Sequence, residues 1–266
     1  MLSENMFGYK NVAIDANVMV NWTILHNLLA RQSSEEIKNK ILKEIKSGKD
    51  SILKKMYGSY NLIENYIIYP IKNYASNESE RKFRFLCSNL SLVELYSVLY
   101  EEQIYEWMSA NFLPSYKIHQ MRREFFKHSN LTYADIIKKY EKELNTIIKK
   151  IDIITLTSKT FGLSSYLIST YGLSNHDAYI IGEAMRAKCV IFITEDGGIL
   201  NVFKDEVKLY ITNTTKVRVR AMKPQTFINK VLIAPPLKPA KQFVETAHGL
   251  EELPGSIATK LGVAGI

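Results

Sequence analysis

The sequence has few cysteines, no long uncharged apolar run and no glycine-rich phosphate-binding loop. Its two cysteines, Cys87 and Cys189, lie in apolar stretches and have neither the number for a disulfide framework nor the spacing of a zinc site. Because there is no transmembrane-length segment and no signal-peptide pattern near the start, we expect an intracellular, cytoplasmic protein that does not enter a membrane. The GxxxxGKS/T and GxGxxG patterns are absent, so the sequence does not predict a P-loop or a dinucleotide-binding site.

The charge balance of the chain is basic. Its 266 residues include 35 lysine and arginine residues against 27 aspartate and glutamate residues, a formal net charge of +8. Such a surface favours a polyanionic partner, nucleic acid first, although a solvated lysine-rich surface explains the same charge equally well. Apolar residues make up 46% of the chain, enough to bury the core of one large domain or two small ones.

Short apolar segments alternate with segments of helical periodicity. We predict β-strands at residues 11–15, 82–88, 152–156, 189–194 and 207–212. We predict helices at residues 33–47, 50–69, 91–108, 113–128, 132–150, 158–171 and 176–187, and one through Val18, Trp22, Leu25 and Leu29. This alternation is typical of an α/β protein with a mostly parallel sheet and helices on both faces, in which ligands bind at the carboxyl ends of the strands.

Four carboxylates stand where a predicted strand ends or a predicted helix begins: Asp15, Glu94, Asp177 and Asp196. Taken singly, each has an ordinary structural explanation. Asp15 and Asp177 are placed to cap a helix N-terminus or to interact with its dipole. Glu94 completes a capping box with Ser91, and Asp196 precedes a Gly-Gly turn.

Taken together, the four carboxylates point to a metal site. The carboxyl ends of parallel strands meet at one edge of a sheet, and alternation along the strand at 189–194 places Thr194 and Asp196 on the same side, with Glu195 on the other. Carboxylates crowded at such an edge repel one another unless a cation compensates. Hard oxygen ligands suit Mg²⁺ or Mn²⁺, and such a site can support attack of water on a phosphodiester.

Three segments in this order, "NVAIDANVMV", "SLVELYSVLYEE" and "LSNHDAYIIGEAMRAKCVIFITED", resemble the PIN-domain nucleases, a family that includes VapC-type toxins and RNA-processing enzymes. The resemblance covers roughly residues 11–213. It implies a three-layer α/β/α fold and an Mg²⁺- or Mn²⁺-dependent endoribonuclease that leaves a 5′-phosphate and a 3′-hydroxyl. By resemblance, the catalytic and metal-binding residues are Asp15, Glu94, Asp177 and Asp196, with Asn17 and Thr194 in support.

The spacing of these motifs predicts insertions. The intervals before and after Glu94 are longer than in compact toxin-type PIN domains, so we expect a PIN-like domain at residues 1–213 with inserted helices at about 31–80 and 113–150. Residues 214–266 are expected to form a C-terminal extension that wraps the domain or meets a partner. Basic stretches offer candidate RNA contacts, although a solvated helix face is the simpler explanation of each stretch: Lys54, Lys55, Arg122, Arg123, Arg218 and Arg220.

Several partners and alternative functions remain open. We expect single-stranded RNA as the substrate, while a second copy of the chain and an antitoxin-like inhibitor are further partners that the resemblance allows. A PIN fold can also serve as a non-catalytic RNA-binding or scaffold protein, or as a structure-specific DNA nuclease. His176-Asp177, with His119 or His128, is also compatible with an all-helical HD-type phosphohydrolase, but the predicted strand at 189–194 contradicts that fold.

Overall fold

The computed structural model describes residues 10–31, 35–46, 52–69, 83–111, 113, 115–128, 130, 132–155, 157–204, 207–212, 215–232, 243–246 and 249–252. The chain forms two compact units, residues 1–228 and 229–266. In the second, β7 (Phe243–Thr246) and β8 (Gly249–Glu252) form an antiparallel hairpin. Residues 70–82, in the first expected insertion, and residues 233–242, in the expected C-terminal extension, lie outside the described residues. No helix in the described ranges is long and apolar enough to cross a bilayer.

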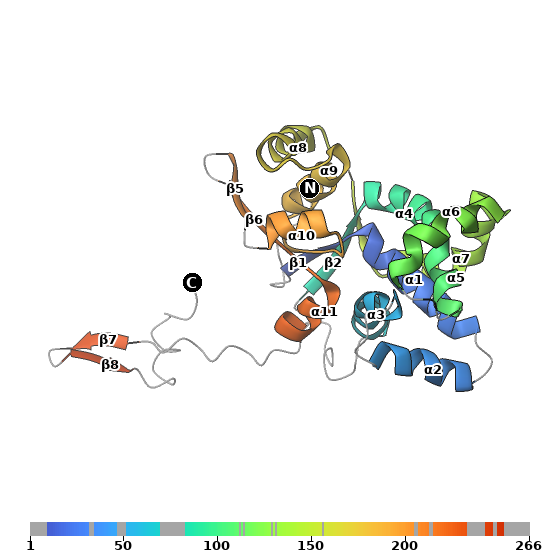
Figure 1. Cartoon of the computed structure of the whole chain (residues 1–266). Helices are drawn as coiled ribbons and strands as arrows, with labels where there is room; N and C mark the ends of the chain where they lie inside the picture. The colour runs from blue at the N-terminus through green and yellow to red at the C-terminus, as the bar shows by residue number, and fades with distance from the viewer. Residues whose placement is uncertain are drawn as a thin grey trace. The chain divides into compact units, whose positions relative to one another are not determined.

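The first unit is built on a six-stranded sheet with the order β3-β2-β1-β4-β6-β5 (Figure 1). Neighbouring strands are parallel from β3 to β6, and β5 pairs antiparallel with β6 at the edge. The strands are β1 (Lys10–Ile14), β2 (Phe83–Ser88), β3 (Asp152–Ile154), β4 (Cys189–Ile193), β5 (Val207–Thr212) and β6 (Thr215–Met222). The predicted α/β class with a mostly parallel sheet is confirmed.

Strand β6 lies just beyond the predicted domain boundary. We expected an extension to begin at residue 214, but residues 215–222 form an internal strand between β4 and β5. The alternation of Lys216, Arg218 and Arg220 has a period of two, and the residues between these cations are apolar. Val219 and Ala221 are buried, so this strand contributes to the core, and the compact unit continues to residue 228.

Helices lie on both sides of the sheet, with α8 and α9 on one side and α3 and α11 on the other (Figure 1). This arrangement is compatible with a three-layer α/β/α fold. The helices are α1 (Ala16–Arg31), α2 (Glu35–Lys46), α3 (Ile52–Leu62), α4 (Asn89–Glu101), α5 (Gln103–Ala110), α6 (Ile118–His128), α7 (Tyr133–Ile148), α8 (Ser158–Tyr171), α9 (Asn175–Arg186), α10 (Gly197–Phe203) and α11 (Pro224–Phe227). Shorter segments are π-helical η1 (Ile63–Ile68) and η4 (Ile228–Leu232) and the 3₁₀ turn η3 (Ser115–Lys117).

Neighbouring helices cover α1. Helices α3 and α7, from the segments expected as insertions, and helices α4 and α5 all pack on it, which explains why α1 is buried on several sides rather than along one stripe. Trp22 of α1 donates its indole N–H to Glu64 of η1 at 2.9 Å, and His26 Nδ1 lies 3.3 Å from the same carboxylate. These contacts fix η1 against the helix that follows β1.

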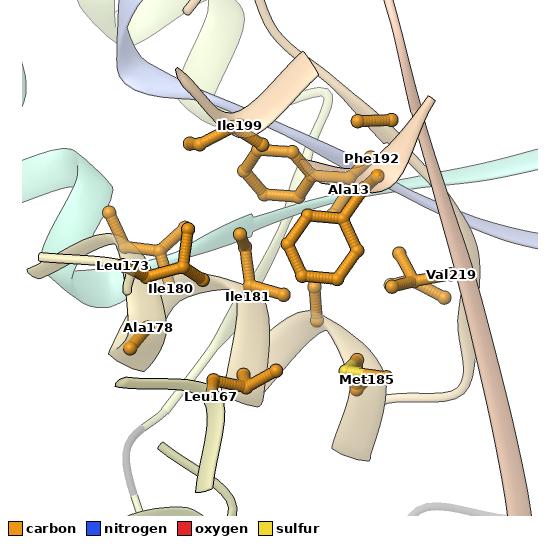
Figure 2. Close-up of a cluster of buried hydrophobic side chains, with 14 of the residues drawn as sticks. Ala13, Leu167, Leu173, Ala178, Ile180, Ile181, Met185, Phe192, Ile199 and Val219 are labelled. Carbon is orange, nitrogen blue, oxygen red and sulfur yellow. The ribbon is translucent and has the colours of Figure 1, made fainter. Parts of the chain in front are cut away.

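The core on the α9 side of the sheet holds this helix in place (Figure 2). Ile181 and Met185 of α9 are buried in one cluster with Phe192 of β4. Gly182 allows α8 to approach, because a Cβ at this position would lie 2.9 Å from Ser164 Oγ. Burying these side chains stabilises the fold by about 1.5–3 kcal/mol per large residue, and it positions the N-terminus of α9 at the candidate site.

Candidate functional site

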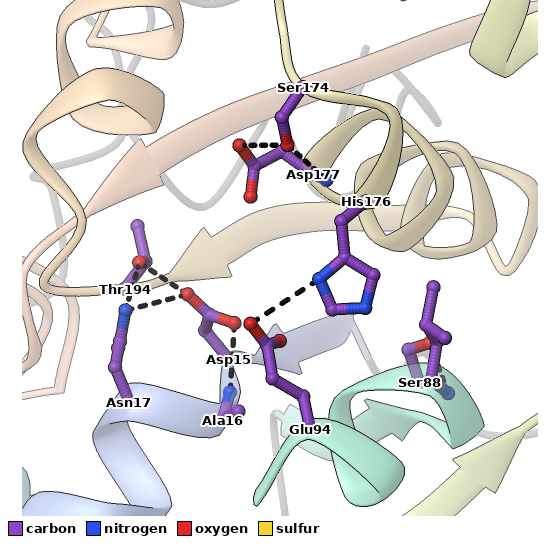
Figure 3. A network of polar contacts seen from close by, with 10 residues as sticks. Asp15, Ala16, Asn17, Ser88, Glu94, Ser174, His176, Asp177 and Thr194 are labelled. Atoms are coloured by element: carbon purple, nitrogen blue, oxygen red, sulfur yellow. Dashed lines mark hydrogen bonds and ion pairs between the residues drawn. The ribbon is translucent and has the colours of Figure 1, made fainter. Parts of the chain in front are cut away.

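Asp15 follows β1 directly, and its side chain is only 6% exposed. Its backbone N–H donates to the carbonyl of Ile193, the last residue of the neighbouring strand β4, at 3.0 Å. Its Oδ1 accepts the N–H of Ala16 at 2.8 Å, and its Oδ2 accepts hydrogen bonds from Thr194 Oγ1 at 2.7 Å and Asn17 Nδ2 at 2.8 Å. Three donors therefore orient this buried carboxylate (Figure 3).

Thr194 connects Asp15 to Asp196. The Thr194 hydroxyl is fully buried, donates to Asp15, and accepts hydrogen bonds from Asn17 Nδ2 at 3.1 Å and from the N–H of Asp196 at 2.9 Å. The side chain of Asp196 caps α10 by accepting the N–H of Ile199 at 2.9 Å. Asn17 and Thr194, predicted as supporting residues, thus belong to one hydrogen-bonded network with two of the predicted acids.

Glu94 and Asp177 reach the same region from α4 and α9. Glu94 Oε1 lies 3.3 Å from His176 Nδ1. Ser174 accepts the N–H of Asp177 at 3.1 Å and donates to Asp177 Oδ2 at 2.7 Å, so it both starts α9 and orients this carboxylate. Figure 3 shows Glu94 directed toward Asp15, with His176 beside it.

The capping box considered for Glu94 and Ser91 is wrong. Helix α4 begins earlier than its apolar pattern indicated, and Ser88 is its N-cap, accepting the N–H of Leu90 at 3.1 Å. Ser91 is buried and does not cap the helix. Glu94 is therefore not used as a cap.

Burial and mutual repulsion raise the pKa values at this site. The pKa of Asp15 rises to about 7, chiefly because burial disfavours its charge. Hydrogen bonds from Thr194 and Ala16 oppose this rise, and the nearby charges of Glu94 and Asp177 add to it. The pKa of Glu94 is raised first by burial, lowered by His176, and raised by Asp177 and Asp196. The four predicted acids therefore share one electrostatic environment.

The donor chemistry of this cluster fits a hard divalent cation. Its oxygens come from carboxylates, a hydroxyl and an amide, which suit Mg²⁺ or Mn²⁺ better than a softer metal. A cation would also compensate the buried charge of Asp15, whose pKa is raised chiefly by burial and further by the charges of Glu94 and Asp177. Within the described ranges, no three His, Cys, Asp or Glu side chains converge closely enough to hold a metal ion.

Other candidate residues have different surroundings. Arg122 pairs with Glu101 at 2.9 Å, and Arg220 Nε donates to the carbonyl of Lys204 at 2.8 Å. Lys54 and Arg123 are exposed on α3 and α6, while the side chains of Lys55 and Arg218 lie outside the described part of the structure. The parallel sheet excludes the all-helical HD-type alternative, and His176 instead contacts Glu94.

Sequence reasoning missed two supporting contacts. His176 was considered only within the HD-type alternative, although its position next to Asp177 places it at the start of the same helix. Glu183 of α9 is buried and accepts a hydrogen bond from Ser88, the N-cap of α4, and burial raises its pKa. The signal in the sequence was Glu183 itself, a charged residue among the apolar residues of the helix predicted at 176–187. Its contact with Ser88 links α9, which carries Asp177, to the start of α4, which carries Glu94.

Comparison with known proteins returned no match: no family model fits the chain, and no curated protein matches its sequence.

Proposed function

We propose that this chain is a PIN-type nuclease that hydrolyses RNA phosphodiester bonds with Mg²⁺ or Mn²⁺. The observation that carries the proposal is the buried, hydrogen-bonded Asp15 between the carboxyl ends of β1 and β4, in the electrostatic field of Glu94 and Asp177. A buried carboxylate with a strongly raised pKa beside further carboxylates is typical of a functional site. The motif order and the central parallel sheet support the PIN-like fold.

The metal-binding residues in this proposal are Asp15, Glu94, Asp177 and Asp196. A divalent ion in such a site makes a bound water nucleophilic near neutral pH, orients the phosphate and stabilises the leaving oxygen. The chain's own residues prepare the site. Thr194 and Asn17 hold Asp15 in one orientation, Ser174 does the same for Asp177, and His176 offsets part of the negative charge around Glu94.

The substrate in this proposal is RNA, single-stranded rather than duplex. The net charge of +8 favours a polyanion. The 5′-phosphate and 3′-hydroxyl products follow from the PIN resemblance.

The test is a cleavage assay on end-labelled single-stranded RNA and DNA of the same sequence, with Mg²⁺, Mn²⁺ or EDTA. We expect metal-dependent cleavage of RNA that falls by roughly a hundredfold or more in Asp15→Asn and in Asp196→Asn, since even outer-shell changes at metal sites cost 10–100-fold. Glu141→Gln, at an exposed position on α7, is the matched control and should cut like the wild type. Cleavage of DNA alone would reassign the substrate, and RNA binding without cleavage in either metal would leave a scaffold.

A further inference from the structure

A pocket of about 370 Å³ opens beside the acidic cluster. We call it the side pocket; its polar lining consists of Asn17, Asn21, Glu102, Tyr105, Glu195 and Lys223. Asn17 belongs to both sites, because its amide nitrogen donates to Asp15 and its amide oxygen accepts the N–H of Glu195 at 3.1 Å. The side pocket and the acidic cluster therefore meet at the side chain of Asn17.

The remaining walls of the side pocket are apolar. Val20 of α1, Met56 of α3 and Val98 of α4 contribute to them. The volume lies at the lower end of the range for small-ligand sites, about 300–1,000 Å³. Apolar walls with polar groups at a few points suit a flat heteroaromatic ring, which needs apolar contact on its faces and hydrogen bonds at its edge.

Glu102 is one of two carboxylates that line the side pocket, and the other, Glu195, contacts Lys223. Glu102 stands at the junction between α4 and α5, and burial raises its pKa to about 7, while the charge of Arg122 opposes that rise. Among the hydrogen bonds of the described residues, none involves its carboxylate. A ligand that presents N–H groups to this carboxylate would compensate its lost hydration.

Lys223 and Glu195 form an ion pair at the mouth of the side pocket. Lys223 Nζ lies 3.8 Å from Glu195 Oε2, and the lysine side chain is 59% exposed, so the ammonium compensates Glu195 and can also contact a ligand from the solvent side. A phosphate is a suitable partner for such an exposed ammonium. A nucleotide can use both this ammonium, through its phosphate, and Glu102, through its base, which a basic side chain cannot do.

We propose that the side pocket receives an unpaired guanine base of the RNA, adjacent to the phosphodiester at the acidic cluster, with Glu102 as the residue that reads it. Guanine is the base whose Watson–Crick edge presents two adjacent donors, N1–H and the N2 amino group, and one carboxylate can accept both. Adenine and cytosine present an amino group beside an acceptor, and uracil presents one N–H. This inference rests on the proposed RNA-cleaving function and adds a base preference to it.

Binding is measured by fluorescence anisotropy in EDTA, so that no cleavage takes place. The ligands are four labelled nine-nucleotide RNAs: one is uridine throughout, and the other three carry a single central G, A or C in a uridine background. We expect the G-containing RNA to bind about tenfold more tightly than the other three, as a bidentate base contact provides. Glu102→Gln should abolish this difference and keep binding of the uridine-only RNA. Glu101→Gln, an adjacent exposed carboxylate paired with Arg122, should retain it.

Equal affinity for the four RNAs, or a guanine preference that survives in Glu102→Gln, would overturn the proposal. A competition arm on the wild type uses free GMP, AMP and N-acetyl-arginine amide against the G-containing RNA. Displacement by GMP alone supports a guanine site, whereas stronger displacement by the arginine compound makes the pocket a site for a protein side chain and overturns it. The binding assay does not depend on cleavage, so its result is independent of the nuclease assay. A guanine preference without cleavage would refute the nuclease proposal alone, and cleavage without a base preference would refute the guanine site alone.

Discussion

Raising the pH of the metal-free protein from 5 to 8 should destabilise its fold through Asp15. The pKa of this carboxyl is about 7 in the folded protein and 3.8 as its ordinary value, because burial disfavours the charged form. The folded state therefore keeps a proton that the unfolded chain has already released. The stabilisation is fully present below the unfolded value and is lost as the pH rises through the folded pKa.

The size of the effect follows from the two pKa values. One pKa unit corresponds to about 1.4 kcal/mol, so the whole rise is worth about 4 kcal/mol. About 3 kcal/mol of this should be lost between pH 5 and pH 8, a large share of a typical unfolding free energy of about 5–15 kcal/mol. Burial also raises the pKa of Glu94, Glu102, Glu183 and Glu195, which act in the same direction.

Asp15→Asn separates the contribution of Asp15 from those of the other carboxyls, since an amide does not ionise. Urea unfolding in EDTA, followed by the fluorescence of the buried Trp22 and the more exposed Trp107, gives the unfolding free energy at each pH. The variant should lose about 3 kcal/mol less than the wild type between pH 5 and pH 8. Glu141→Gln should follow the wild type.

Added Mg²⁺ or Mn²⁺ provides a second test of the same reasoning. At pH 8 a metal that binds only the folded protein should recover part of the lost stability in the wild type and much less in Asp15→Asn. If the wild type and Asp15→Asn lose stability in parallel from pH 5 to pH 8, burial of Asp15 does not cause the pH dependence. The electrostatic reasoning would then be refuted.

Further predictions concern the support of the site and the packing around it. Thr194→Val removes the hydroxyl that contacts Asp15 and should lower both RNA cleavage and the urea midpoint, whereas Thr194→Ser should retain most of both. Gly182→Ala should cost about 1–3 kcal/mol in thermal unfolding because its Cβ would crowd α8, while Gly162→Ala, with open space around it, should be neutral or stabilising. Thr132→Ala breaks the capping box of α7 and should cost about 1 kcal/mol, with faster hydrogen exchange confined to the first turn of that helix.

Local signals in the sequence were sufficient for most of the sheet. The apolar run before Thr194 predicted β4, and the strand before Asp15 predicted β1, because burial and turn residues leave a short-range pattern. Strand β6 was not predicted, because its alternating cations suggested a basic surface stretch. The valines between the cations fit the buried face of a strand. The N-cap of α4 was also misplaced, since two serines near its start fit a cap equally well and only the backbone decides between them.

The contacts between distant segments could not be predicted in this way. Asp15 and Thr194 are 179 positions apart, and their hydrogen bond exists because β1 and β4 are neighbours in the sheet. The pair of Lys223 and Glu195 likewise depends on β6 lying beside β4. The order of parallel strands leaves no local pattern, because each strand is buried on both faces whichever strand lies next to it.

The sequence by itself determined that carboxylates would stand at strand ends and helix starts, since periodicity and turn chemistry act over a few residues. Only the tertiary structure decided that Asp15 would be buried, that His176 would face Glu94, and that α1, α3, α4 and α5 would line a pocket beside Asn17. Those properties depend on which elements pack together. Desolvation and charge–charge interactions act over distances in space and not along the chain.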